Sequence, residues 1–188
     1  MANSSIRILG IDPGSRITGY GVIDSDGRRY RHVASGVVKA AEGTFPERLK
    51  VIFDGIREVV AAHQPDEIAI EEVFVHRSVS SALKLGQARG AALAAAMTRS
   101  LPVHEYTPTK VKRSITGQGH ADKVQVQHMV RILVGLSFPP GSDEADALAV
   151  ALCHANAGGD PARRGESVAR PRRRSSRPAS LAALRPKR

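Results

Sequence analysis

Hydrophobic positions follow two different spacings along this chain. Short apolar runs rich in β-branched residues and bounded by Gly, Pro or Asp predict strands; they lie at 6–12, 17–23, 29–39, 67–71 and 102–106. Apolar residues repeated every three or four positions predict helices; these cover about 45–63, 78–99, a short segment from 108, 121–135 and 142–154. Three strands followed by alternating helices and strands predict an α/β fold, in which helices flank a mixed five-stranded sheet.

Local signals place several ends of these elements. Thr44 and Glu47 have the spacing of a capping box, so the first helix is expected to start there. That helix should end near His63, because the residue before Pro65 resists helical conformation. Ser142 is expected to cap the last helix.

The composition of the chain changes at residue 158. Residues 1–157 are expected to form one domain, whereas Pro, Arg, Ser, Ala and Gly dominate 158–188, which contains no aromatic residue. Such a segment cannot bury enough apolar surface to offset the entropy of ordering, so we expect a disordered basic tail. Ten of the 28 Lys and Arg residues, but only two of the 18 acidic residues, lie after residue 156. The tail either improves solubility or tethers DNA through salt-sensitive phosphate contacts.

Charge and cysteine content narrow the class of protein. The formal net charge of +10 favours an anionic partner such as nucleic acid. Cys153 is the only cysteine, so no intramolecular disulfide can form, which fits a reducing compartment. The N-terminus lacks the apolar stretch of a signal peptide, and no run approaches the roughly 20 apolar residues of a membrane span. We therefore expect a soluble, cytoplasmic protein that does not bind membranes.

Four acidic residues lie beside segments that are expected to be buried. Asp12 and Glu71 each end an apolar strand, and alternation along the strand places Glu71 on the face of Ala69. Asp143 and Asp146 open the last helix and share one of its faces, because they are three residues apart. Unpaired buried charge is costly, and carboxylates that face one another repel and raise one another's pKa values.

Each of these acids also has a purely structural explanation. Asp12 precedes Pro-Gly, which is a turn sequence. Glu71 and Glu72 could leave the sheet at its edge, and the dipole of a helix stabilises acids in its first turn. If the four acids converge, however, Mg²⁺ offsets their repulsion, because it prefers oxygen ligands and often meets a phosphate in the same site. Two such ions about 4 Å apart support in-line hydrolysis of a phosphodiester, which suggests nuclease chemistry in a basic protein.

Four sequence motifs occur in order between about residue 6 and His154: ILGIDPGSRITGYG at 8–21, AIEEVF at 69–74, SALKLGQARG at 81–90 and DEADALA at 143–149. Together they resemble the RuvC family of crossover junction endodeoxyribonucleases, the bacterial Holliday-junction resolvases. The resemblance implies an RNase H-like fold and a homodimer that nicks symmetrically related strands of a four-way DNA junction. It also implies a preference for Mg²⁺ and action with the RuvA–RuvB branch-migration complex in recombination and repair.

The resemblance assigns roles to individual residues. The family's catalytic, metal-binding acids match Asp12, Glu71, Asp143 and Asp146, whereas Glu72 falls outside that set. All four acids are present, which argues against a catalytically silent junction-binding module.

Three further residues are candidates for DNA contact. Lys112 and Lys123 flank the loop at 117–119, whose N–H groups, with the N-terminus of the following helix, can cradle a phosphate. The resemblance places both lysines near the scissile phosphate and implies that Phe74 stacks on an unpaired junction base. It also places part of the small-residue helix 78–99 at the dimer interface. Isolated surface lysines, a core phenylalanine and a closely packed helix are the structural alternatives.

Some features depart from the commoner family pattern. Glu144 adds a charge between the last two acids, His120 occupies a position that is more often small or basic, and the basic tail is long. The seven histidines are scattered without metal-ligand spacing, so each is expected at the surface or in the core. Cys153 is expected to be a small core residue.

Two other functions compete with a resolvase. The loop at 10–15 also resembles the phosphate loop of actin-like ATP-binding domains, but those proteins need two such subdomains and this chain is too short for both. A RuvC-like nuclease of the YqgF type, acting on other nucleic acid, is a nearer alternative. The motif at 81–90 and the paired acids of the last helix favour Mg²⁺-dependent hydrolysis of DNA at four-way junctions.

Overall fold

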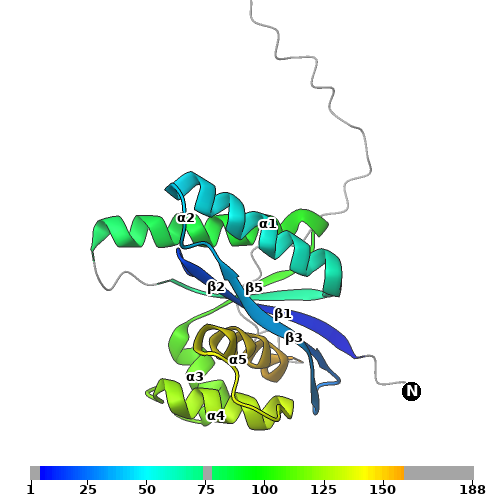
Figure 1. Ribbon diagram of the computed structural model, residues 1–188. Helices are drawn as coiled ribbons and strands as arrows, with labels where there is room; N and C mark the ends of the chain where they lie inside the picture. Colours follow the sequence, from blue (N-terminus) through cyan, green and yellow to red (C-terminus); the bar gives the residue numbers. More distant parts are fainter. Residues whose placement is uncertain (1–4, 74–77, 159–188) are drawn as a thin grey trace, which may run out of the picture.

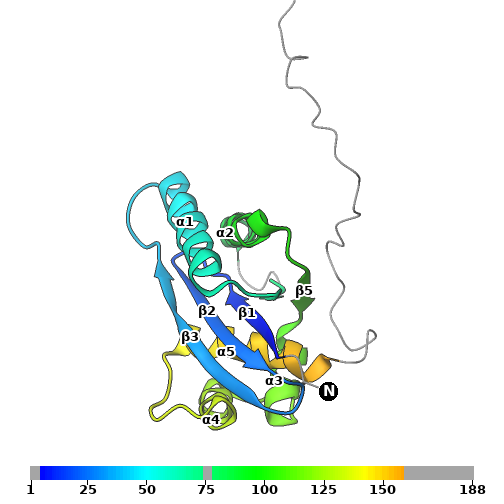
Figure 2. The same ribbon diagram turned by 90° about the vertical axis from the view of Figure 1, so that its right-hand side faces the viewer.

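The computed structural model describes residues 5–73 and 78–158, which form a sheet with helices on both faces (Figures 1 and 2). The strands are β1 (Ile6–Asp12), β2 (Ile17–Ser25), β3 (Tyr30–Lys39), β4 (Glu67–Glu71) and β5 (Val103–Tyr106). Their order in the sheet is β3-β2-β1-β4-β5. Strands β1 to β3 pair antiparallel, while β4 joins β1 and β5 joins β4 in parallel. The mixed five-stranded sheet predicted from the sequence is confirmed.

Two helical layers cover this sheet. On one face lie α1 (Phe45–His63) and α2 (Val79–Ala96), with a 3₁₀ turn at Met97–Arg99 (Figure 2). On the other face lie α3 (Pro108–Thr116), α4 (Lys123–Val134) and α5 (Ser142–Ala157) (Figure 1). Among the described residues, no helix is both long and apolar enough to cross a membrane.

Alternation along the strands separates two hydrophobic cores. Ile8 of β1 and Ala69 of β4 belong to the core beneath α5, whereas Leu9 and Ile68 belong to the core beneath α1 and α2. Side chains two residues apart on a strand share a face. Asp12, four residues after Ile8, and Glu71, two after Ala69, therefore point to the α5 side.

Two strand glycines allow α5 to lie directly on the sheet. A Cβ atom at Gly10 would lie 2.2 Å from the carbonyl oxygen of Ala147, and one at Gly19 would lie 2.0 Å from that of Asp143. Both separations are shorter than any van der Waals contact. The lack of side chains at these positions thus sets how closely α5, and the acids in its first turn, approach β1 and β2.

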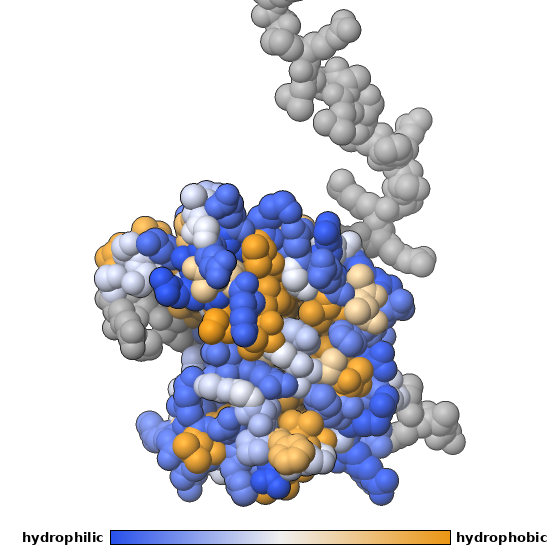
Figure 3. All heavy atoms as spheres, in the orientation of Figure 1, coloured by the Kyte–Doolittle hydropathy of each residue, from blue (hydrophilic) through white to orange (hydrophobic). Residues whose placement is uncertain are grey.

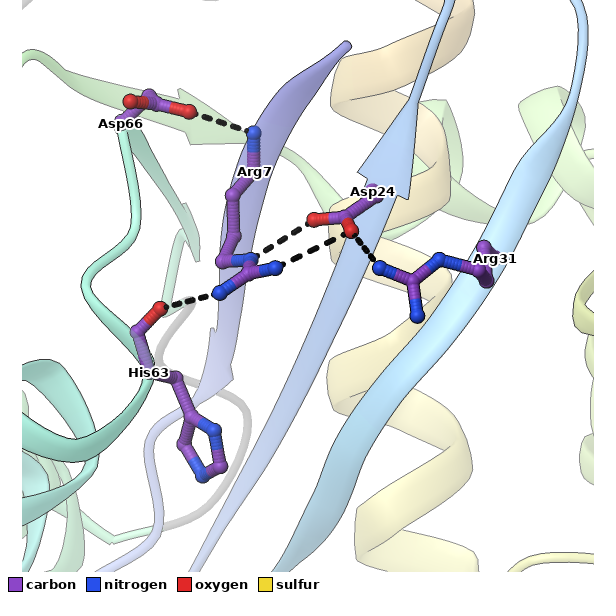
Figure 4. A network of polar contacts seen from close by, with 5 residues as sticks. All are labelled: Arg7, Asp24, Arg31, His63 and Asp66. Atoms are coloured by element: carbon purple, nitrogen blue, oxygen red, sulfur yellow. Dashed lines mark hydrogen bonds and ion pairs between the residues drawn. The ribbon is translucent and has the colours of Figure 1, made fainter.

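A polar network joins the start of β4 to the first strands (Figure 4). The Arg7 guanidinium donates two hydrogen bonds to the Asp24 carboxylate, at 2.7 and 3.2 Å, and a third to the carbonyl of His63 at 2.9 Å. Its backbone N–H donates to Asp66 at 2.7 Å, and Arg31 pairs with the same Asp24. The hydrogen bond from Arg7 lowers the pKa of Asp24. This network satisfies a terminal carbonyl of α1 and fixes the loop that leads into β4.

The ends of most elements agree with the sequence. Glu47 accepts hydrogen bonds from the Thr44 N–H and hydroxyl at the start of α1, and α1 ends at His63. The expected cap of α5 is wrong, because Gly141 is the N-cap and Ser142 is the first helical residue. Cys153 is buried, as expected. The fold is described as far as Gly158, so the expected tail lies almost entirely outside the described residues.

Candidate active site

The ends of two neighbouring strands bring the first two acids together. β1 and β4 run parallel in adjacent positions, with Ile11 opposite Ile70. Asp12 and Glu71 are the next residues on each strand, and both face α5. The two carboxyl groups are hydrogen-bonded to each other. Parallel pairing therefore makes neighbours of two acids that are 59 positions apart in the sequence.

The first turns of α5 supply the other two acids. Asp146 lies on the same cavity wall as Asp12 and Glu71, while the charge of Asp143 acts on Asp12 from the helix start. The cavity has a volume of about 280 Å³. The residues that line it are Asp12, Glu71, Pro108, Val111, Lys112, Lys123, Val126, Asp146 and Ala149. Three of the four predicted acids and both predicted lysines thus surround one space.

Burial and mutual repulsion disfavour full ionisation of these acids. Burial, followed by the charge of Asp12, raises the pKa of Glu71 to about 8. Burial, followed by the charges of Asp146 and Asp143, raises the pKa of Asp12 to about 6. Raised pKa values with these causes indicate excess negative charge in a partly dehydrated place. Such a site favours a cation.

Lys123 supplies part of the missing positive charge. Its Nζ donates hydrogen bonds to Asp146 Oδ2 and to Ser142 Oγ, each at 3.1 Å. The hydrogen bond to Asp146 raises the pKa of Lys123. Lys112, on α3, lowers the pKa of Glu71 by its charge, although burial of Glu71 outweighs that effect. Both lysines are thus close enough to the acids to meet an anion bound there.

Two further parts of the expected DNA-contact region are the phosphate cradle at the start of α4 and Phe74. At the N-terminus of α4, the Gln125 N–H donates to Asp122 Oδ1 at 2.8 Å, so the protein's own carboxylate occupies part of the predicted phosphate cradle. Phe74 lies outside the described residues.

Glu144 has a structural role that its sequence position did not reveal. Its carboxylate accepts a hydrogen bond from the Gly141 N–H at 3.0 Å, which caps α5, and one from Ser35 of β3 at 2.5 Å. It therefore faces the meander and not the cavity, and the charge expected beside the acids is directed elsewhere.

Arg89 contributes to the site in a way that the sequence analysis missed. From α2, its Nε donates to the backbone carbonyl of Glu71 at 3.2 Å, and its NH2 pairs with Glu105 at 2.5 Å. This side chain holds the end of β4 from the face opposite the cavity. The residue belongs to the motif at 81–90, but its distance of 18 positions from Glu71 gave no signal of contact.

The donor set of the cavity fits a hard divalent cation. The acids that line it offer only carboxylate oxygens, which Mg²⁺ prefers. The two lysines that line the same cavity can bind an anionic ligand beside the acids. In the absence of a cation, burial and repulsion keep protons on part of the set.

Comparisons with known proteins agree with this geometry. The model of the family "Crossover junction endodeoxyribonuclease RuvC" matches residues 8–154. The protein of that name from Azoarcus sp. (strain BH72) is 56% identical over 152 residues, which cover 81% of this chain and 83% of the relative. A relative from Alkalilimnicola ehrlichii is 55% identical over 148 residues, covering 79% and 90%. The structure of T. thermophilus RuvC in complex with Holliday junction substrate matches with a TM-score of 0.75 and 40% identity, over 80% of this chain and 93% of that chain.

Proposed function

This chain belongs to the RuvC family of crossover junction endodeoxyribonucleases, and we propose that Asp12, Glu71, Asp143 and Asp146 form its Mg²⁺-dependent nuclease centre. The protein is a Holliday-junction resolvase with an RNase H-like fold, a hydrolase of DNA recombination and repair. This assignment favours the resolvase over the YqgF-type nuclease and the actin-like ATP-binding domain. One observation carries the proposal: acids from β1, β4 and α5 line one cavity, where burial and repulsion raise two of their pKa values.

Different residues would bind the metal ions, bind the phosphate and position the strand end during phosphodiester hydrolysis. Asp12, Glu71 and Asp146 would hold two Mg²⁺ ions, with Asp143 completing the set from the start of α5. Bound Mg²⁺ supplies an activated water and stabilises charge that develops on the phosphate oxygens. Lys123 and Lys112 bind and orient the phosphate at the open side of the acids, and Arg89 holds the strand end that presents Glu71.

The substrate and partners follow from the same assignment. The substrate is four-way junction DNA, and Phe74 stacks on an unpaired base of that junction. The protein acts in the cytoplasm as a homodimer, together with the RuvA–RuvB branch-migration complex. One face of α2, formed by Val79, Ala82, Leu83, Gly86 and Gln87 and mostly apolar, lines a hollow of about 520 Å³ and supports the homodimer. In the space-filling view, hydrophobic residues interrupt a largely hydrophilic surface in the layer of α1 and α2 (Figure 3).

A cleavage assay with two substrates tests the proposal. A synthetic mobile four-way junction and a linear duplex of the same sequence are incubated with the protein in Mg²⁺ or in chelator. We expect paired nicks in the junction only with Mg²⁺, and little cutting of the duplex. Cutting that persists in chelator, or equal cutting of both substrates, would reject a metal-dependent junction resolvase.

Substitution of single acids tests the assigned residues. Asp146→Asn and Asp12→Asn keep the size of each side chain but remove its charge, so each should abolish cleavage and leave junction binding nearly intact. Gel-shift affinity and single-turnover cleavage measure the two effects separately. Lys50→Met on α1, a surface residue whose exposure is 77%, serves as the matched control that should cut normally. If either acid variant still cleaves the junction, the role assigned to that residue in the nuclease centre is rejected.

A further inference from the structure

A second group of potential metal ligands lies outside the nuclease cavity. Glu67 at the start of β4, His104 of β5 and His154 near the end of α5 each offer one ligand atom, and these atoms lie within 4.8 Å of one another. We call these three residues the His–Glu cluster. The sequence predicted no metal-ligand role for any histidine, because the two in this cluster are 50 positions apart. The fold joins them: β4 and β5 are paired, and α5 packs on the same face.

Both imidazoles direct the same ring atom at one carboxylate oxygen. Nε2 of His154 lies 2.6 Å from Glu67 Oε2, and Nε2 of His104 lies 3.5 Å from that oxygen. The two rings stack with centroids 4.5 Å apart and an angle of 28° between their planes. Both ring nitrogens therefore converge on one small volume between three secondary-structure elements.

The spacing of these atoms suits a tetrahedral transition metal. Metal–nitrogen and metal–oxygen distances of about 2.0–2.2 Å place tetrahedral ligands about 3.4 Å apart. The separation of 3.5 Å between His104 and Glu67 already meets that value. The separation of 2.6 Å between His154 and Glu67 must widen by about 0.8 Å, which rotation about the long Glu67 side chain can supply.

The second ring nitrogen of His154 has a hydrogen-bond partner that suits both the metal-free and the metal-bound form. Its Nδ1 lies 2.6 Å from the hydroxyl of Tyr106. A hydroxyl can donate or accept, so it can pair with Nδ1 whether or not that nitrogen carries the proton. When Nε2 binds a metal, the proton of the neutral ring moves to Nδ1 and donates to the Tyr106 oxygen. A hydrogen bond from the second ring nitrogen is the usual support of a metal-bound histidine.

The two imidazoles and one carboxylate of the His–Glu cluster prefer a different class of ion than the four acids of the nuclease centre do. Nitrogen ligands suit Zn²⁺, Co²⁺ and similar ions, whereas Mg²⁺ prefers oxygen ligands only. The half-buried carboxylate of Glu67 adds an acidic oxygen ligand to the two imidazoles, which suits a divalent cation. His154 is 1% exposed and Glu67 is 17% exposed, so one side remains open for a water as the fourth ligand.

The His–Glu cluster is spatially separate from the nuclease centre. Glu67 precedes Glu71 by four residues, or about 13 Å along a strand. His154 follows Asp146 by eight residues, or about 12 Å along a helix. The same two elements, β4 and α5, thus carry acids at one end and the His–Glu cluster at the other.

We propose that Glu67, His104 and His154 form a structural site for one Zn²⁺-class ion, distinct from the Mg²⁺ centre. The ion ties β4 and β5 to α5 and so fixes the elements that present Glu71, Asp143 and Asp146. Its presence does not depend on the roles proposed for the four acids.

Binding of Co²⁺, a spectroscopic stand-in for Zn²⁺, to the full chain tests this proposal. Co²⁺ bound by two imidazoles in a four-coordinate site absorbs strongly in the visible range, whereas octahedral Co²⁺ among carboxylates absorbs weakly. We expect one equivalent of Co²⁺ to bind with strong visible absorption. Zn²⁺ should displace it, and excess Mg²⁺ should not. X-ray absorption of the Zn²⁺ form should show scattering from two imidazole rings. Zn²⁺ should also raise the Tm of the protein, because a ligand of the folded state stabilises it.

Two ligand variants and two controls assign the signal to the His–Glu cluster. His104→Gln and Glu67→Gln should each weaken Co²⁺ binding by at least about 100-fold, since each loses a direct ligand. His128→Gln, which changes an exposed histidine of α4, is the matched control and should bind normally. Asp146→Asn should also keep the strong absorption. Circular dichroism confirms that each variant is folded, and Glu67→Gln remains informative if His104→Gln is not.

Several outcomes would overturn the proposal. These are the absence of a strongly absorbing equivalent in the wild type, equal binding by His104→Gln and His128→Gln, and loss of the signal in Asp146→Asn with retention in Glu67→Gln. The last would place the ion among the four acids instead.

Discussion

Glu71 and Asp12 hold more protons in the folded protein than in the unfolded chain. Their pKa values rise from ordinary values of 4.5 and 3.8 to about 8 and about 6, first because of burial. Where the folded state binds more protons, the free energy of unfolding falls as pH increases. Without metal, the two acids therefore lower stability progressively from about pH 4 to about pH 8. Mg²⁺ bound as proposed should reverse this loss, because it would bind the ionised carboxylates.

Thermal unfolding at two pH values checks this linkage. We expect Mg²⁺ to raise Tm by a few degrees at about pH 8.5 and by much less at about pH 5.5. Glu71→Gln, which stays uncharged, should be more stable than the wild type at the higher pH in chelator and should lose most of the gain from Mg²⁺. An equal Mg²⁺ effect at both pH values would contradict the assignment of these acids to the metal.

Lys123 pairs with Asp146 in this structure, and we propose that it contacts the scissile phosphate when DNA is bound. Removing its charge in Lys123→Met should lower the single-turnover cleavage rate by about 10²-fold, the usual effect of losing one group that stabilises transition-state charge. Lys123→Arg should retain more activity, and junction affinity should change little in both variants. Lys50→Met on α1 again controls for the loss of one surface charge. A rate for Lys123→Met near that of the control would show that its ammonium group does not meet the phosphate.

Individual site residues differ in how far sequence could identify them. Asp12 and Glu71 could be found because an acid at the end of an apolar strand is costly without a partner. Arg89 and the His–Glu cluster could not, because their contacts join elements whose pairing is set only by the whole sheet. Glu144 shows the opposite case. Its position between two acids suggested an added charge beside the site, whereas its side chain caps α5 and reaches Ser35.

At the scale of elements, contact between α5 and the first two strands controls the geometry of the acids. Alternation along β4 correctly predicted that Glu71 shares the face of Ala69, because a strand has a fixed period of two. The close approach of α5 was not predictable, since a strand glycine has several explanations until its neighbour is known. The cap of α5 was misplaced by one residue, because Gly141 precedes Ser142 and takes the capping position itself.

The variant Gly19→Ala tests the close contact between α5 and β2. Its Cβ atom would press on the carbonyl of Asp143, so α5 must shift at the turn that carries the acids. We expect Gly19→Ala to lower the free energy of unfolding by about 2 kcal/mol and to reduce cleavage by the molecules that remain folded. Gly10→Ala, which meets Ala147 farther along α5, should destabilise similarly but reduce the cleavage rate less. Urea unfolding and cleavage per folded molecule separate the two effects; equal rates in the two variants would refute this role of Gly19.

At the scale of the whole molecule, a four-way junction has two strands to cut and each chain has one nuclease cavity among its described residues. Two copies are therefore needed for paired nicks. On α2, Val79 is 74% exposed and Leu83 is 63% exposed, and these side chains lie four residues apart on one helix face. Exposed apolar residues at this spacing are expected to be covered by another helix, and a second copy of α2 provides one.

Leu83→Glu should separate the two copies without damaging either nuclease cavity. A charge in the centre of the proposed apolar interface would remain unpaired. The variant should therefore be monomeric in analytical ultracentrifugation at concentrations where we expect the wild type to be a dimer. On a supercoiled plasmid that extrudes a cruciform, the dimer should make two nicks before it dissociates and yield linear DNA. The monomer should instead accumulate nicked circles. Val51→Glu, which places the same charge at an exposed apolar position of α1, should behave like the wild type in both assays. If Leu83→Glu stays dimeric and still yields linear DNA, the two copies meet through another surface.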